Sequence, residues 1–203
     1  MDNIQRRSLQ GQIRSVSDDN GSKVIEGVSL VYNTLSDFRN PSPRGLFYEK
    51  IDPGAFVDSI KGDVGCYYDH KHLLGRTSSG TLQLSNDEHG LRFRCTLPDT
   101  TYANDLVVSL ERGDVYGCSF GFAEAVYDWS QDQDGNLVGT VVRARLFDVG
   151  PVNQPVYDSS SVDLRSLDAF LAKSKQHLDE AAQTAWFELA SRRLKYQSQK
   201  LND

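Results

Sequence analysis

Histidine is the side chain of this sequence that first suggests chemistry. Only four histidines occur in 203 residues, and two of them lie in the segment Tyr67-Tyr68-Asp69-His70-Lys71-His72. This segment ends a stretch with the two-residue period of a strand, where a side chain can be both anchored and exposed. Because histidine ionises near neutral pH, His70 is a candidate for accepting a proton during a reaction.

A metal site is an alternative use of the same segment. Cys66, His70 and His72 are close in sequence, and thiolate and imidazole groups bind zinc. Such a site needs further ligands with support around them, whereas His89 lies in a predicted turn and His177 in the C-terminal part. We therefore expect no metal and no cofactor, and a metal-dependent hydrolase remains an alternative.

A serine surrounded by glycines is the second chemical feature. Gly117-x-Ser119-x-Gly121 matches the nucleophile pattern of the α/β-hydrolases, but that pattern requires a helix directly after the serine. Here an alternation of two continues through Trp129, which indicates a strand. Ser119 is the candidate nucleophile and His70 the base that takes its proton. Cys118 would point to the opposite face of this strand.

A base of this kind needs a partner on its second ring nitrogen. Asp148 is an acidic residue in an otherwise apolar strand end, Leu146-Phe147-Asp148-Val149-Gly150, and is a candidate for orienting His70. Two alternatives stay open from the residues alone. Asp69 is a competitor for the orienting role, and Asp148 could instead cap the turn that leads into Pro151.

The elements that must position these residues are mainly strands. An apolar period of two runs from Gln12 to about Pro151, and turn sequences rich in Gly, Asn and Asp interrupt it. We predict an α+β fold, mainly an antiparallel β-barrel with short flanking helices and a C-terminal helical tail. The predicted strands are 12–16, 23–32, 46–51, 64–70, 81–84, 91–97, 115–129 and 137–149, and the short helices are 53–60 and 101–112.

The pattern changes after Pro155, where a helical period begins and continues to the end of the chain. From Leu164 onward the chain carries 7 basic and 5 acidic residues, although the whole protein has a net charge of −6. We therefore predict two parts, a barrel domain over 1–160 and a helical tail over 161–203.

Composition excludes several function classes. An acidic chain without a Lys/Arg-rich run argues against nucleic-acid binding. No window approaches the roughly 20 apolar residues of a membrane span, and the first residues do not form a signal peptide, so we expect a cytosolic protein. Three scattered cysteines, Cys66, Cys95 and Cys118, indicate buried thiols and no disulfide framework.

Several separated motifs resemble the prohead maturation protease family of tailed phages over about residues 10 to 160. In chain order they are Asp52-Pro53-Gly54-Ala55-Phe56, Asp69-His70 with Leu74-Gly75-Arg76-Thr77, Gly90-Leu91-Arg92-Phe93, Arg112-Gly113-Asp114-Val115, Ser119-Phe120-Gly121-Phe122 and Leu146-Phe147-Asp148-Val149. The family is similar in fold to the herpesvirus assemblins, which are serine proteases built on a small β-barrel. The resemblance implies an assemblin-like protease domain over 1–160.

The resemblance also implies roles for single residues. His70 matches the family histidine and Ser119 the family serine, and Asp148 stands in the place of the acidic third member. Many relatives have a serine after the following valine, where this chain has Gly150. Arg143 and Arg145, on the strand of Asp148, are candidates for binding the oxyanion.

The resemblance further implies a serine endopeptidase that acts during maturation of the phage prohead. Its expected substrates and partners are the scaffolding protein or the scaffolding segment of the major capsid protein, and the protease itself. It would act as a homodimer or higher oligomer, inside the immature capsid in the host cytoplasm. The tail would bind scaffold or be removed by self-cleavage. A catalytically inactive capsid or scaffold-binding structural protein is the main alternative.

Overall fold

The computed structural model describes residues 4–10, 13–17, 21–36, 39–42, 44–88, 90–153, 166–176, 180–181 and 184. The chain divides into two compact units, residues 1–163 and residues 164–203. In the second unit, residues 166–176 are helical, and most of the predicted tail lies outside the described residues. Separate roles for the two parts remain a prediction.

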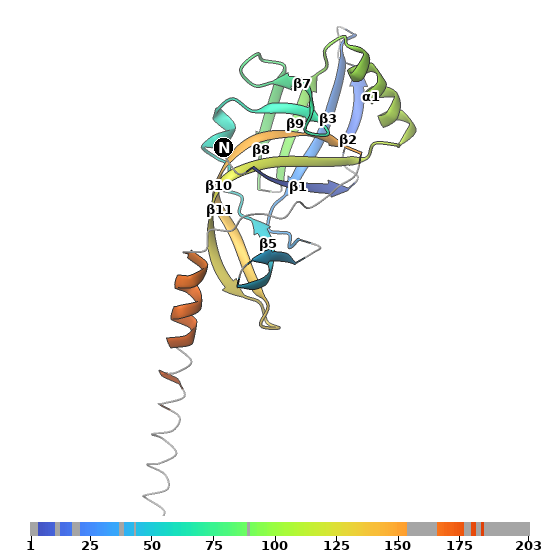
Figure 1. Cartoon of the computed structure of the whole chain (residues 1–203). Coiled ribbons are helices and arrows are strands. Elements are labelled where there is room, and N and C mark those ends of the chain that lie inside the picture. Colours follow the sequence, from blue (N-terminus) through green and yellow to red (C-terminus); the bar gives the residue numbers. More distant parts are fainter. Residues whose placement is uncertain are drawn as a thin grey trace, which may run out of the picture. The chain divides into compact units, whose positions relative to one another are not determined.

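The first unit is built mainly from strands (Figure 1). These are β1 (Gln5–Gln10), β2 (Ile13–Ser17), β3 (Lys23–Val31), β4 (Asn40–Ser42), β5 (Gly45–Ile51), β6 (Gly65–Tyr68), β7 (His72–Arg76), β8 (Leu82–Asn86), β9 (Gly90–Thr96), β10 (Gly117–Gln131) and β11 (Leu137–Val152). They are accompanied by a short 3₁₀ helix, η1 (Ser59–Lys61), and by helix α1 (Thr101–Arg112).

The strands form two sheets, and the described residues contain no closed barrel, so the predicted β-barrel is not confirmed. One sheet has four strands in the order β2-β3-β9-β8. The other has seven, with β1-β10-β11-β5-β4 along its main path, β6 paired with β11, and β7 paired with β6. A two-residue period identifies strands and their faces, but it does not specify whether the outermost strands pair and close the sheet.

The seven-stranded sheet is mixed, although most strand pairs of the fold are antiparallel, as expected. β11 runs antiparallel to β10 but parallel to β5 through Val138–Val141 and parallel to β6 at Asp148 and Val149. Parallel partners need long crossover connections, and no turn sequence marks them. Pairings between consecutive strands were predictable. Consecutive predicted strands pair antiparallel in β2-β3, β8-β9 and β10-β11.

Of the two predicted helices, 101–112 is confirmed with the same bounds. It ends at Gly113, whose φ of +79° is the left-handed conformation that glycine adopts readily. The helix predicted over 53–60 is wrong, because this segment consists of turns followed by η1. Asp52 caps the first turn by accepting a hydrogen bond from the Gly54 amide at 2.7 Å. Val57, within this segment, is 45% exposed.

An aromatic cluster lies beneath the strand that carries Ser119. Phe120 and Phe122 on β10 stack on each other at 5.6 Å between ring centroids. Phe56, from the turns before η1, packs edge-on against both rings at 6.0 Å. All three side chains are almost fully buried. This packing anchors the segment of β10 next to the candidate nucleophile.

Candidate active site

The structure brings the three candidate catalytic side chains into one hydrogen-bonded chain. His70 Nε2 lies 2.8 Å from Ser119 Oγ, and His70 Nδ1 lies 2.7 Å from Asp148 Oδ1. Ser119 is 1% exposed, and the His70 side chain is 16% exposed. The three residues come from separate elements, namely β10, the turn after β6, and β11. The spatial meeting expected of Ser119 and His70 is therefore present.

Two adjacent strands hold the serine and the aspartate. β10 and β11 are antiparallel, with Ser119 opposite Gly150 and Gly121 opposite Asp148. On its other side, Asp148 is the register partner of Gly65 at the start of β6. Because β6 leads directly to His70, this parallel pairing determines where the imidazole lies relative to the carboxylate.

His70 does not continue a strand as predicted, because β6 ends at Tyr68 and a tight turn follows. Asp69 and His70 both have left-handed backbone conformations, with φ of +49° and +55°. Asp69 holds this turn against the end of β11. Its amide donates to the Pro151 carbonyl and its Oδ1 accepts from the Asn153 amide, each at 3.0 Å. Asp69 thus stabilises the turn, whereas Asp148 is the carboxylate that contacts the His70 imidazole.

Two glycines leave the space that this arrangement needs. A Cβ atom at Gly121 would lie 2.8 Å from Asp148 Oδ2 and 3.0 Å from Asp148 Cγ. A Cβ atom at Gly150 would lie 2.1 Å from the Tyr67 carbonyl oxygen, and Gly150 has a φ of +150°. Gly150, the departure from the family pattern, is thus required by the close approach of the chain just before His70.

The site has a contact that the sequence did not indicate. Ser119 Oγ also lies 2.7 Å from the backbone carbonyl oxygen of Arg7, on β1. The Arg7 guanidinium is buried, and it forms an ion pair with Glu49 through Nε–Oε1 at 2.5 Å and Nη2–Oε2 at 2.9 Å. Tyr127 donates a hydrogen bond to Glu49 Oε2 at 2.9 Å. Burial, aided by the Glu49 carboxylate, raises the pKa of Tyr127 well above its usual value, so this phenol stays protonated.

The other candidate residues lie in different surroundings. Cys66 and Cys118 are buried, and burial raises the pKa of both thiols, that of Cys118 to about 12. Neither thiol is therefore suited to nucleophilic attack. The His72 ring stacks on Tyr102 at 5.3 Å. Arg145 pairs with Glu124 at 3.1 Å, and an oxyanion role for it or for Arg143 remains a prediction.

A metal site is not found in the described part of the chain. No group of three or more His, Cys, Asp or Glu side chains there is arranged to hold a metal ion. His89 and His177 lie outside the described residues. The geometry around His70 thus favours an acid–base role over metal ligation.

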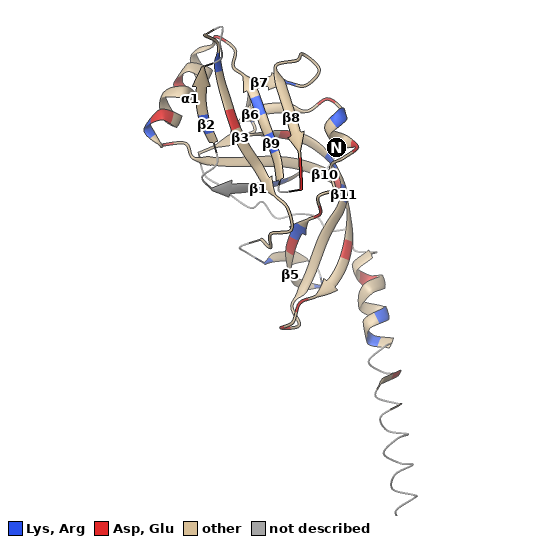
Figure 2. Ribbon diagram, turned by 180° about the vertical axis from the view of Figure 1, so that it is seen from behind, with Lys and Arg blue, Asp and Glu red and all other residues tan. Residues whose placement is uncertain are grey.

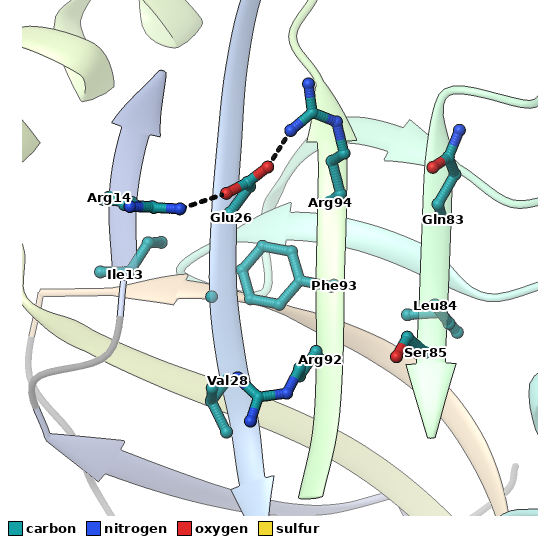
Figure 3. Close-up of a pocket in the computed structure, with 11 residues that line it drawn as sticks. Ile13, Arg14, Glu26, Val28, Gln83, Leu84, Ser85, Arg92, Phe93 and Arg94 are labelled. Atoms are coloured by element: carbon teal, nitrogen blue, oxygen red, sulfur yellow. Dashed lines mark hydrogen bonds and ion pairs between the residues drawn. The ribbon is translucent and has the colours of Figure 1, made fainter. Parts of the chain in front are cut away.

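A cavity of about 660 Å³ lies on the four-stranded sheet (Figure 3). Glu26 on β3 forms ion pairs there with Arg14 on β2 and Arg94 on β9, and Phe93 lies beside them (Figure 3). Ser119, His70 and Asp148 do not line it. This cavity is therefore not part of the candidate active site.

Charge is spread over the molecule. Lys and Arg lie interspersed with Asp and Glu along the strands and on α1 (Figure 2). In the described residues, no helix is long and apolar enough to span a membrane.

Matches to known proteins come from a solved structure and from a protein-family model. The chain is similar in structure to the bacteriophage T4 capsid assembly protease gp21, with 9% sequence identity, a TM-score of 0.48, and coverage of 74% of this chain and 97% of that one. A search of curated proteins found no match. The family model described as caudovirus prohead serine protease matches residues 10–173, which is most of the chain. The protein therefore belongs to the prohead serine proteases of the tailed phages.

Proposed function

We propose that this prohead protease cleaves peptide bonds with Ser119 as the nucleophile, His70 as the general base and Asp148 as its orienting partner. The observation that carries the proposal is the continuous contact from Asp148 Oδ1 through both nitrogens of His70 to Ser119 Oγ. Asp148 Oδ1 accepts a hydrogen bond from the Nδ1–H group of His70, and this tautomer directs the Nε2 lone pair at the serine hydroxyl.

The reaction follows in two halves. As Ser119 Oγ bonds to the scissile carbonyl carbon, its proton moves to His70 Nε2, and Asp148 stabilises the imidazolium. His70 then gives this proton to the leaving amine, the carbon–nitrogen bond breaks, and an acyl-enzyme remains on Ser119. Water attacks the ester after losing a proton to His70, and that proton returns to Ser119 as the acid product leaves.

The substrates that we propose are the scaffolding protein or the scaffolding segment of the major capsid protein, and the protease itself. Membership of the prohead protease family supports this choice. In the same proposal, the enzyme acts as a homodimer or higher oligomer inside the immature capsid, in the host cytoplasm. The segment 161–203 would bind scaffold or be removed by self-cleavage.

The two alternative functions fit the site less well. A capsid or scaffold-binding structural protein would not need a serine, a histidine and a carboxylate at hydrogen-bond distance from one another. A metal-dependent hydrolase would need a ligand cluster, and the described residues contain none.

The deciding experiment is co-expression of the chain with its cognate capsid and scaffold proteins, followed by mass mapping of new chain ends. Ser119→Ala should abolish the new ends, with a rate loss of about 1,000-fold or more. Ser29→Ala is a matched control, because Ser29 is a buried serine on β3 outside the site, and it should process normally. Unchanged cleavage in Ser119→Ala would exclude the serine-protease mechanism.

A further inference from the structure

β1 occupies an edge of the seven-stranded sheet, directly beside the strand that carries the nucleophile (Figure 1). It pairs antiparallel with β10 over six residues, and Ser8 is the register partner of Ser119. β10 already pairs with β11 on its other side. With both edges of this segment paired and Ser119 only 1% exposed, no second backbone can pair with β10 at the serine.

The β1 backbone also competes with His70 for the hydroxyl proton. Ser119 Oγ has two acceptors at similar distances, the Arg7 carbonyl oxygen at 2.7 Å and His70 Nε2 at 2.8 Å. A serine hydroxyl has one proton and can donate it to one acceptor at a time. While it is donated to Arg7, the proton is not aligned for transfer to the base. Removal of this carbonyl leaves His70 as the acceptor.

A buried ionic network holds β1 in this place. The Arg7 guanidinium binds both carboxylate oxygens of Glu49 on β5, and it also lies 3.3 Å from Gln5 Oε1. Tyr127 OH bonds to Glu49 and to Gln5, at 2.9 and 3.2 Å. These contacts join both ends of the Gln5–Arg7 segment to the body of the protein.

β1 lies mostly outside the residues that the family model matches. The family match begins at residue 10, so all of β1 except Gln10 precedes it. An extended segment that places a carbonyl at a nucleophile has the backbone arrangement of a peptide added to a sheet edge. It covers the serine without belonging to the matched region.

We propose that the edge of β10 from Gly117 to Phe122 is the binding site for the extended backbone of the substrate. In this proposal β1 occupies that site in the structure and must leave it before cleavage. The proposal rests on the proposed role of Ser119. A substrate strand in place of β1 would set one of its own carbonyl groups near Ser119 Oγ, where the Arg7 carbonyl now lies.

The first test locks β1 in place with a reversible bond. Leu9 is the register partner of Cys118, and opposed residues of an antiparallel pair have Cα atoms about 4.5 to 5.5 Å apart, within the range of a disulfide. Oxidised Leu9→Cys should lose at least about tenfold in both scaffold cleavage and labelling of Ser119 by a fluorophosphonate. Reduction with dithiothreitol should restore both rates.

Controls separate the lock from oxidation itself. The wild-type chain and Leu9→Ala, treated with the same oxidant, should keep their rates, and mass mapping should show the 9–118 disulfide only in Leu9→Cys. Full labelling and cleavage by a chain shown to carry this disulfide would overturn the proposal, since β1 would then not need to leave. Loss of all Ser119-dependent activity in the reduced and control proteins would instead count against the proposed function.

The second test releases β1 and decides the question even where the disulfide does not form. Arg7→Met with Glu49→Gln removes both charges of the network together and avoids a buried unpaired charge. The full-length double variant should be labelled by the fluorophosphonate about threefold faster or more. Arg14→Ala, which breaks an exposed ion pair on the other sheet, is the control and should match the wild type. An unchanged labelling rate in a folded double variant would refute the proposal that β1 blocks the substrate-binding edge of β10.

Discussion

At the scale of single residues, the two neighbouring histidines provide a matched comparison. His70 contacts Ser119 and Asp148, whereas His72 stacks on Tyr102 at the start of β7. His70→Ala should lower the cleavage rate about 1,000-fold or more, because the nucleophile loses its base, and the fold should be retained. His72→Ala should stay within about twofold of the wild type. Cleavage assays and circular dichroism on both variants test this prediction. A wild-type cleavage rate in His70→Ala would show that His70 is not the general base.

The two candidate orienting carboxylates provide a second comparison. Asp148→Asn should reduce cleavage about 100-fold or more, because an amide can stabilise the wrong imidazole tautomer and does not stabilise the imidazolium. The loss should be smaller than in Ser119→Ala. Asp69→Asn should have little effect, since the remaining amide oxygen can still accept from the Asn153 amide. A larger defect in Asp69→Asn would reassign the orienting role.

The three cysteine thiols should be unreactive toward alkylating reagents in the folded protein. All three are buried, and burial raises the pKa of Cys118 to about 12, so this thiol stays protonated at pH 8. Iodoacetamide at pH 8 should therefore leave cleavage unchanged, and thiol titration should detect the cysteines only after unfolding in urea. Rapid inactivation by iodoacetamide at that pH would point to a catalytic thiol.

At the scale of elements, the pairing of β10 with β11 determines how much space the candidate catalytic carboxylate of Asp148 has. Gly121→Ala places a methyl group 2.8 Å from Asp148 Oδ2, so the carboxylate must move away from its present position. We expect about a tenfold or greater loss of cleavage, with a modest effect on thermal stability. Thermal melting and cleavage rates measured together on the same preparations test this.

Gly80→Ala is the control for the general cost of replacing a glycine. Gly80 has a φ of +73° and open space around its Cβ position, so alanine should destabilise the fold by about 1 kcal/mol without affecting cleavage. If Gly121→Ala behaves in the same way, the carboxylate position is not set by this glycine.

At the scale of the whole molecule, the division into two units predicts separable activities. The candidate catalytic residues all lie in the unit 1–163. A chain that ends at residue 163 should react with a fluorophosphonate at Ser119 at about the wild-type rate, because the hydrogen-bonded triad is complete without the rest. It should process the capsid scaffold poorly if the segment 161–203 recruits that substrate. Normal scaffold processing by the shortened chain would remove the recruiting role of the tail.

Much of the local structure could be predicted from the sequence. The alternation of apolar residues gave most strands, and the turn sequences located the hairpins, because both signals depend on neighbouring residues. Helix 101–112 was predictable from its apolar stripe and the glycine that ends it. Ser119, His70 and Asp148 were identifiable as candidates because chemistry restricts the residue types that can serve, and because their motifs occur in the order of a known family.

Pairing at long range was decided by the tertiary structure alone. The parallel contacts of β11 with β5 and β6, and the absence of barrel closure in the described sheets, depend on which edges meet in space. The contact between Ser119 and the Arg7 carbonyl joins residues 112 positions apart. A backbone carbonyl is the same chemical group in every residue, so no residue type marks the one that covers a nucleophile. Side-chain chemistry therefore identified the candidate reacting groups, and the packing of distant strands determined how they are oriented, covered and supported.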